Sequence, residues 1–180
     1  MKRIFLIGYM GSGKTTLGKI LSGRLRLEFI DLDNYIENRY HKTIRSIFEE
    51  KGEEGFRVIE KNMLHEVGEF DNVLIATGGG TPCFFDNMEY MNRQGAAVYL
   101  KTLPEILHRR LKVAKSKRPL LKDKDDEELM TFICENLSRR SPMYEKAGFV
   151  FDADKLDTYE ELEQSADLLC ALLSPYLSED

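Results

Sequence analysis

Short apolar segments of strand length alternate along the chain with longer segments that carry apolar residues at helical spacing. The expected strands are 3–7, 28–32, 72–77, 96–101 and 149–151. The expected helices are 15–27, 34–40, 44–70 with breaks near Gly52 and Gly55, 104–111, 125–144 and 158–177. The strand-like segments are apolar at consecutive positions, as strands buried on both faces of a sheet require. The pattern predicts an α/β fold with helices on both faces of a parallel sheet and with ligands beyond the carboxyl ends of its strands.

Composition limits the remaining possibilities. The chain has 180 residues, 42% of them hydrophobic and 32% charged, and a formal net charge of −5. This length predicts one domain over residues 1–180 that can bury a core without a disulfide or metal. The charge balance argues against a uniformly basic nucleic-acid binder, and no apolar run reaches the roughly 18 residues of a membrane span. Cys83, Cys134 and Cys170 are widely spaced, which is typical of free thiols in a reducing cytoplasm.

The loop after the first expected strand carries a phosphate-binding pattern. Residues 8–15 read GYMGSGKT and match G-x-x-x-x-G-K-[ST]. Glycines at these positions let backbone N–H groups approach phosphate oxygens, and the following helix presents further N–H groups and a positive dipole end. Lys14 would reach the β- and γ-phosphates, and the Thr15 hydroxyl would ligate Mg²⁺. The pattern indicates binding of a nucleoside triphosphate and leaves the phosphoryl acceptor open.

Two aspartates follow the second expected strand. Asp31 and Asp33 are two residues apart, so an extended backbone would direct both carboxylates to the same side. One could hold the shell of a Mg²⁺ ion while the other accepts a proton from an acceptor hydroxyl. Asp33 is also a good N-cap for the next helix. The two interpretations are evenly balanced on this motif alone.

Arg57 and Glu60 lie three residues apart on an expected helix and therefore share a face. On this pair alone, a surface ion pair of little energetic value is the simpler interpretation. The alternative is an arginine that its glutamate orients to fork onto a carboxylate or phosphate.

Gly78, Gly79 and Gly80 follow the third expected strand, and three glycines favour close approach of the backbone to a ligand. Arg139 and Arg140 lie near a helix end, where they could cap the helix or form a second anion clamp.

Positive charge is concentrated in one segment of this acidic chain. Residues 109–124 contain eight basic residues and one acidic residue. A solvated helix face and a nucleic-acid patch are possible interpretations, but a mobile cationic lid over a triphosphate fits better. Arg118, before Pro119, is the candidate transition-state arginine.

Together these motifs resemble those of the shikimate kinase family over residues 2–173. The matching residues are Gly8, Gly11, Gly13, Lys14 and Thr15 in the phosphate loop, Asp31 and Asp33, Phe56, Arg57 and Glu60, the triple glycine, residues 118–121 (RPLL), and Arg140, Pro142 and Tyr144.

The resemblance implies a P-loop kinase three-layer sandwich whose five-stranded parallel sheet has the order 2-3-1-4-5. It also implies a substrate-binding helical region at about 33–61 and a lid at about 112–124. The implied reaction is ATP- and Mg²⁺-dependent phosphorylation of the shikimate 3-hydroxyl to shikimate 3-phosphate and ADP, in aromatic amino-acid biosynthesis. Shikimate and ATP would be the partners of a cytoplasmic monomer that binds neither nucleic acid nor membrane.

The resemblance also implies roles for individual residues. Lys14, Asp33 as base, and Arg118 would be catalytic. The substrate would contact Asp33, Arg57, Glu60, Gly78, Gly79, Gly80, Arg140, Phe48 and Phe56. The nucleotide would contact Gly11, Ser12, Gly13, Lys14, Thr15, Thr16, Arg110 and Arg118. Thr15, and Asp31 through water, would hold the metal.

Two competing functions remain open. One is a kinase for another small acceptor, such as gluconate or a nucleoside monophosphate. The other is a nucleotide-binding regulatory module without catalysis, against which the presence of Lys14, Thr15, Asp33 and Arg118 argues.

Overall fold

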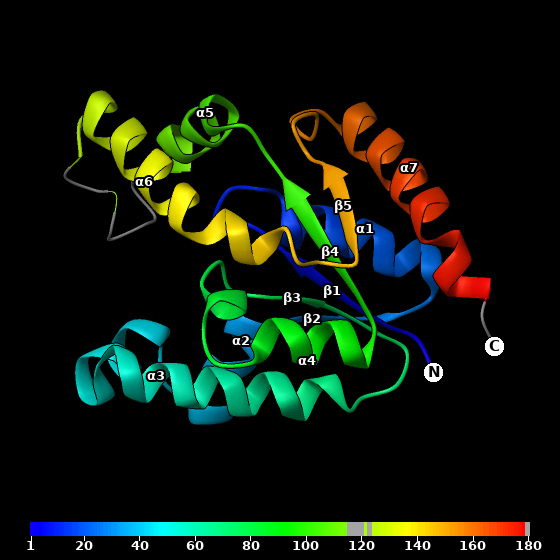
Figure 1. Ribbon diagram of the computed structural model, residues 1–180, viewed down its shortest axis with the longest axis horizontal. Coiled ribbons are helices and arrows are strands. Elements are labelled where there is room, and N and C mark those ends of the chain that lie inside the picture. The colour runs from blue at the N-terminus through cyan, green and yellow to red at the C-terminus, as the bar shows by residue number, and fades with distance from the viewer. Residues whose placement is uncertain (115–120, 122–123, 179–180) are drawn as a thin grey trace.

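A parallel sheet forms the centre of the molecule (Figure 1). The computed structural model describes residues 1–114, 121 and 124–178. The strands are β1 (Arg3–Ile7), β2 (Glu28–Asp31), β3 (Val73–Ala76), β4 (Ala96–Lys101) and β5 (Phe149–Asp152). The five strands pair in the order β2-β3-β1-β4-β5, and every neighbouring pair is parallel. The expected strand order is confirmed.

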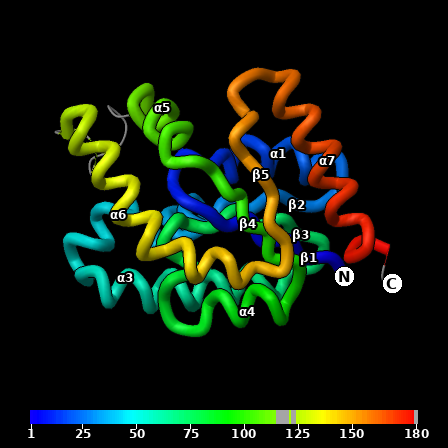
Figure 2. The backbone as a smooth tube through the Cα atoms, turned by 45° about the horizontal axis from the view of Figure 1, so that its top comes forward, coloured from blue at the N-terminus to red at the C-terminus, as the bar shows by residue number. Residues whose placement is uncertain are grey.

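Helices cover both faces of this sheet, as Figures 1 and 2 show. They are α1 (Lys14–Leu25), α2 (Leu32–Tyr40), α3 (Ile44–Gly68), α4 (Asn87–Gln94), α5 (Pro104–Ala114), α6 (Asp126–Tyr144) and α7 (Tyr159–Ser178), with a 3₁₀ turn η1 (Thr81–Cys83). The start of β1 and the end of α7 lie side by side in both views, where Lys2 Nζ donates to the Leu177 carbonyl at 2.6 Å.

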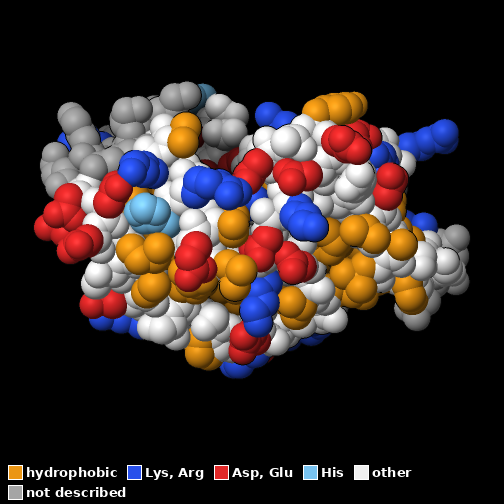
Figure 3. Space-filling view, turned by 90° about the horizontal axis from the view of Figure 1, so that it is seen from above, with side chains coloured by type: hydrophobic (Ala, Val, Ile, Leu, Met, Phe, Trp, Pro, Cys, Tyr) orange, Lys and Arg blue, Asp and Glu red, His pale blue; other side chains and the backbone are white. Residues whose placement is uncertain are grey.

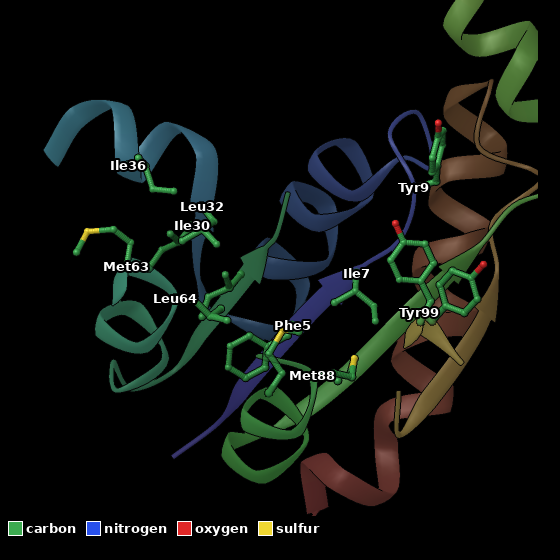
Figure 4. Close-up of a cluster of buried hydrophobic side chains, with 14 of the residues drawn as sticks. Phe5, Ile7, Tyr9, Ile30, Leu32, Ile36, Met63, Leu64, Met88 and Tyr99 are labelled. Carbon is green, nitrogen blue, oxygen red and sulfur yellow. The ribbon is translucent and has the colours of Figure 1, made fainter. Parts of the chain in front are cut away.

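Alternation along the strands builds a separate core on each face. Ile4 and Leu6 of β1 pack with residues of α1 and α7, whereas Phe5 and Ile7 pack in the second core with residues of α2 to α6. Figure 4 shows part of the second core, where Phe5 lies near Leu64 and Met88. Because successive strand residues point to opposite faces, a strand covered on both sides must be apolar throughout.

The structure differs from the sequence patterns in three local details. The sequence patterns did not indicate α4 or the 3₁₀ turn, which the structure places between β3 and β4. The N-cap of α2 is Asp31 rather than Asp33, because the Asp31 side chain accepts from the Asn34 N–H at 3.3 Å. The α3 segment bends only at Gly52, with φ 68° and ψ 179°, and stays helical at Gly55.

Candidate active site

A cavity of about 600 Å³ opens at the carboxyl ends of the strands. The loops after β1, β2 and β3 meet there because parallel strands end at one edge of the sheet. Sixteen of the predicted site residues line it: Gly11, Gly13, Lys14, Thr15, Thr16, Asp31, Asp33, Phe48, Phe56, Arg57, Glu60, Gly78, Gly79, Gly80, Arg110 and Arg140. The remaining two are Ser12, which does not line the cavity, and Arg118, which lies outside the described residues.

The phosphate loop has the backbone that its glycines permit. Gly8, Gly11 and Gly13 have φ of 143°, 82° and 93°, angles that other residues rarely adopt. No side chain caps the first turn of α1, so its N–H groups suit an anion. Lys14 Nζ donates to the carbonyls of Gly8 at 2.8 Å and Tyr9 at 2.9 Å, which holds its ammonium group at the loop.

Ser12 takes a different place from its neighbours. Its side chain is fully buried, and no described residue forms a hydrogen bond with its hydroxyl. Its N–H donates to the Tyr9 carbonyl at 3.2 Å. The residue therefore closes the turn of the loop, and its side chain does not reach the cavity.

Thr15 and Asp31 provide oxygen atoms suited to a hard cation. The Thr15 hydroxyl donates to Asp31 Oδ2 at 2.9 Å, and both residues line the cavity. The described residues contain no group of three or more His, Cys, Asp or Glu side chains that could enclose a metal. One hydroxyl and one carboxylate fit Mg²⁺, which usually keeps several waters and takes phosphate oxygens as its other ligands.

Asp33 lies in the first turn of α2, with surface open to the cavity. Burial, together with the neighbouring carboxylates of Asp31 and Glu60, raises the pKa of its carboxyl to about 6, while Lys14 opposes this shift. A base whose pKa lies near the working pH is efficient at taking a proton. The surroundings of Asp33 therefore suit a general base.

Arg57 and Glu60 do not form a surface ion pair. Arg57 Nη1 donates to Glu60 Oε2 at 2.8 Å, and the two side chains are only 11% and 1% exposed. A buried pair that lines a cavity holds the arginine in one geometry. The interpretation as an oriented arginine thus fits better than the surface pair.

Arg140 reaches the same cavity from α6. Its guanidinium carbon lies 5.6 Å from the centroid of the Tyr9 ring. No basic residue lies in the last turn of α6, so Arg140 does not cap the helix end. Phe48 and Phe56 stack with ring centroids 4.3 Å apart and form an apolar wall of the cavity.

Each glycine of the triple glycine has a different close neighbour. A Cβ at Gly78 would lie 3.1 Å from Asp33 Oδ1, and one at Gly80 would lie 2.7 Å from Arg57 Nη2. At Gly79 the nearest atoms belong to the phosphate loop and Arg140. The glycines therefore let the charged side chains of the site lie directly against the backbone.

Arg110 connects α5 to two loops at the cavity. It donates to Asp157 Oδ1 at 2.7 Å and to the carbonyls of Ala153 at 3.0 Å and Asp154 at 2.8 Å. Within the expected lid at 112–124, the structure describes only 112–114, 121 and 124. On the face shown in Figure 3, basic and acidic side chains are interspersed among the described residues.

Sequence reasoning missed several residues at or beside this site. Tyr9 lies under Arg140, and Thr81 and Phe84 contact Glu60 and Arg57. Leu156 and Asp157 line the cavity from the loop after β5. Two sequence features could have indicated such residues. Tyr9 lies inside the phosphate-loop pattern, and Thr81 directly follows the triple glycine.

A glycine-rich loop with the phosphate-binding pattern and two arginines line one cavity at the carboxyl edge of this parallel sheet, an arrangement typical of P-loop kinases of small molecules. Comparison with known proteins narrows the class. The family model described as shikimate kinase matches residues 10–169, and the chain belongs to the shikimate kinase family.

Individual relatives agree over nearly the whole chain. The shikimate kinase of Phocaeicola vulgatus is 59% identical over 169 residues, which cover 94% of this chain and 97% of the relative. The crystal structure of the shikimate kinase from Bacteroides thetaiotaomicron has a TM-score of 0.94 and 55% identity, covering 96% of this chain and 98% of that chain. The enzyme from Acinetobacter baumannii, solved in complex with shikimate, has a TM-score of 0.82 and 34% identity, covering 99% and 96% of the two chains.

Proposed function

We propose that this protein transfers the γ-phosphoryl group of ATP to the 3-hydroxyl of shikimate, giving shikimate 3-phosphate and ADP in aromatic amino-acid biosynthesis. Membership of the shikimate kinase family supports this reaction. One observation on the chain itself carries it: Arg57, Arg140 and Asp33 line the cavity that the phosphate loop also lines. Two cations beside a carboxylate suit a small acid that bears hydroxyl groups.

Each residue has a task in this proposal. Arg57 and Arg140 hold the carboxylate of shikimate, and Glu60 orients Arg57. Phe48 and Phe56 pack against its ring, while the triple glycine offers backbone contacts. Asp33 accepts the proton of the 3-hydroxyl. The oxygen of that hydroxyl bonds to the γ-phosphorus, while the bond from this phosphorus to the bridging oxygen of ADP breaks. The reaction needs alignment and charge neutralisation more than covalent chemistry.

On the nucleotide side, Lys14 and the N–H groups at the start of α1 bind the phosphates, and Arg110 lies beside the nucleotide. Mg²⁺ held by Thr15, and by Asp31 through water, would neutralise charge on the phosphate oxygens. Arg118 and the lid at about 112–124 complete the proposal as a transition-state arginine and a cover that excludes water, both outside the part of the chain that the structure describes in full.

We also propose that the enzyme acts as a cytoplasmic monomer on two small molecules. In the described part of the chain, no helix has the length and apolar character to cross a bilayer. Light scattering of the purified protein at its working concentration tests the oligomeric state, and a dimer mass would contradict the monomer.

The decisive experiment is an assay of ADP release with Mg²⁺-ATP and shikimate, run in parallel with gluconate, quinate and nucleoside monophosphates. Release with shikimate alone supports the proposed function. Release with another acceptor would reassign the substrate, and ATP binding without release on any acceptor would point to a non-catalytic module.

A further inference from the structure

The 3₁₀ turn after the triple glycine contacts the Arg57–Glu60 pair. The Thr81 hydroxyl donates to Glu60 Oε1 at 2.6 Å, and the other carboxylate oxygen accepts from Arg57 at 2.8 Å. Thr81 and Glu60 are 0% and 1% exposed, so water does not compete for either bond. We propose that Thr81 is a positioning residue, acting through Glu60, for the arginine that binds the substrate carboxylate. This inference rests on the proposed function.

The backbone holds the Thr81 hydroxyl in place. The Thr81 N–H donates to the Gly78 carbonyl at 3.2 Å, and Cys83 N–H donates to the Gly80 carbonyl at 2.9 Å. Asn87, buried at the start of α4, donates to the Thr81 carbonyl at 2.8 Å. The turn is therefore tied both to the triple glycine and to α4, and its hydroxyl has a fixed direction.

This hydroxyl controls how Glu60 can bind Arg57. A free carboxylate commonly takes both terminal nitrogens of a guanidinium in a bidentate pair. With Oε1 bonded to Thr81, Glu60 accepts one bond from Arg57, at Nη1, and the hydrogen bond of Nη2 among the described residues is a 3.5 Å contact with the exposed Glu53. Thr81 thus leaves one edge of the guanidinium for the substrate.

The same segment also covers the guanidinium. The Phe84 ring centroid lies 4.0 Å from the Arg57 guanidinium carbon, within the range of a cation–π contact. Residues 80–84 therefore contact both the arginine and its carboxylate partner, which restricts the rotamers of Arg57.

The test compares Thr81→Val, which removes the hydroxyl and keeps the shape, with Thr81→Ser, which keeps the hydroxyl. We expect Thr81→Val to raise the KM for shikimate by about tenfold or more, the effect of losing a hydrogen bond to a charged group. The kcat and the KM for ATP should stay within about twofold of the parent, and Thr81→Ser should restore the KM. Should Thr81→Val not fold, Thr81→Ala takes its place.

Thr102→Val is the matched control. Its hydroxyl is also buried but finds no hydrogen-bond partner among the described residues, and Thr102 does not line the cavity of the candidate active site, so the shikimate KM should not change. An unchanged KM in Thr81→Val, or an equal rise for ATP, would overturn the inference.

A crystal structure of Thr81→Val tests the inference without any substrate. Glu60 with both oxygens on Arg57, or Arg57 in another rotamer, supports positioning by Thr81, and an unchanged pair contradicts it. Failure of the parent enzyme to phosphorylate shikimate would reject the proposed function, while this structure would still decide the role of Thr81.

Discussion

The protonation of a carboxyl group depends on its surroundings, and Asp33 lies among other carboxylates. With its pKa raised to about 6 by burial and then by Asp31 and Glu60, the group is deprotonated above pH 6 and protonated below it. A base must be deprotonated to accept a proton. We expect kcat/KM for shikimate at saturating ATP to be level above pH 6 and to fall about tenfold per unit below it.

A pH series from 5 to 8 measures this profile. Asp33→Asn should lower kcat at least about 10²-fold and remove the inflection near pH 6. A parent profile that stays level down to pH 5 would exclude Asp33 as the base.

Lys14 is the second residue whose substitution should change the kinetics. Its ammonium group lies at the phosphate loop, where in the proposed reaction it would stabilise charge on the transferred phosphoryl group. We expect Lys14→Ala to lower kcat by at least about 10²-fold, measured by ADP release at saturating substrates. Lys19→Ala removes an exposed lysine of the same helix and should leave kcat unchanged. An unchanged kcat in Lys14→Ala would reject the role of the lysine.

Substitution of either arginine of the clamp should change the KM for one substrate only. Because both would bind the substrate carboxylate, we expect Arg57→Ala or Arg140→Ala to raise the shikimate KM by 10²-fold or more, about 3 kcal/mol for a lost charged pair. The KM for ATP should change little. Arg139→Ala alters the exposed neighbour and serves as control. Equal losses for both substrates would contradict the clamp.

At the scale of elements, α3 carries much of the acceptor side. Phe48 precedes its bend at Gly52, while Phe56, Arg57 and Glu60 follow it. The left-handed φ of Gly52 thus sets the angle between the wall residue Phe48 and the clamp. A Cβ at Gly52 would meet no described atom within 4 Å. The positive φ, rather than a lack of space, therefore favours glycine at this position.

Two glycine substitutions separate backbone strain from helix propensity. Gly52→Ala forces a side chain into φ 68°, and we expect a loss of about 1–3 kcal/mol of unfolding free energy with a raised shikimate KM. Gly23 lies exposed within α1, with open space around a Cβ, so Gly23→Ala should add about 0.5–1 kcal/mol. Urea unfolding measures both. Equal stability of the two variants would contradict the strain at Gly52.

Sequence patterns located the strands well, because buried parallel strands are continuous apolar runs. They missed α4, whose buried positions Met88, Tyr90 and Met91 form no long helical stripe and whose N-cap Asp86 makes no side-chain capping bond to the helix. Packing against α3 and β4 stabilises this helix instead. The strand order came from the family resemblance, since apolar runs do not specify which strands pair.

Motifs that follow strands found most of the cavity lining, because the fold collects strand ends at one edge. Contacts made across the fold could not be found in this way. Arg57 meets Phe84, and Glu60 meets Thr81, only once the turn after β3 packs against α3. The alternative interpretation of Asp33 as an N-cap fails because α2 begins earlier than its apolar pattern indicates.

For the whole molecule, one sheet with a core on each face supports the cavity that the proposed function assigns to both substrates. Ligands that bind only the folded state raise its stability, by about 2.7 kcal/mol at 100 times Kd. We expect shikimate and Mg²⁺-ATP each to raise Tm by roughly 5–10 °C at such concentrations. Arg57→Ala should lose the shift with shikimate and keep that with ATP, in differential scanning fluorimetry. Loss of both shifts together would argue against separate subsites.

The restricted Arg57 side chain has a consequence for inhibitor discovery. Ordering a long side chain ordinarily subtracts from the affinity of a small ligand, but contacts with Glu60 and Phe84 within the protein itself already hold this guanidinium in place. A compact, rigid carboxylic acid should therefore retain an unusually large share of its interaction energy for each heavy atom. Fragment libraries rich in flat acids are the natural starting point for chemistry on this pocket.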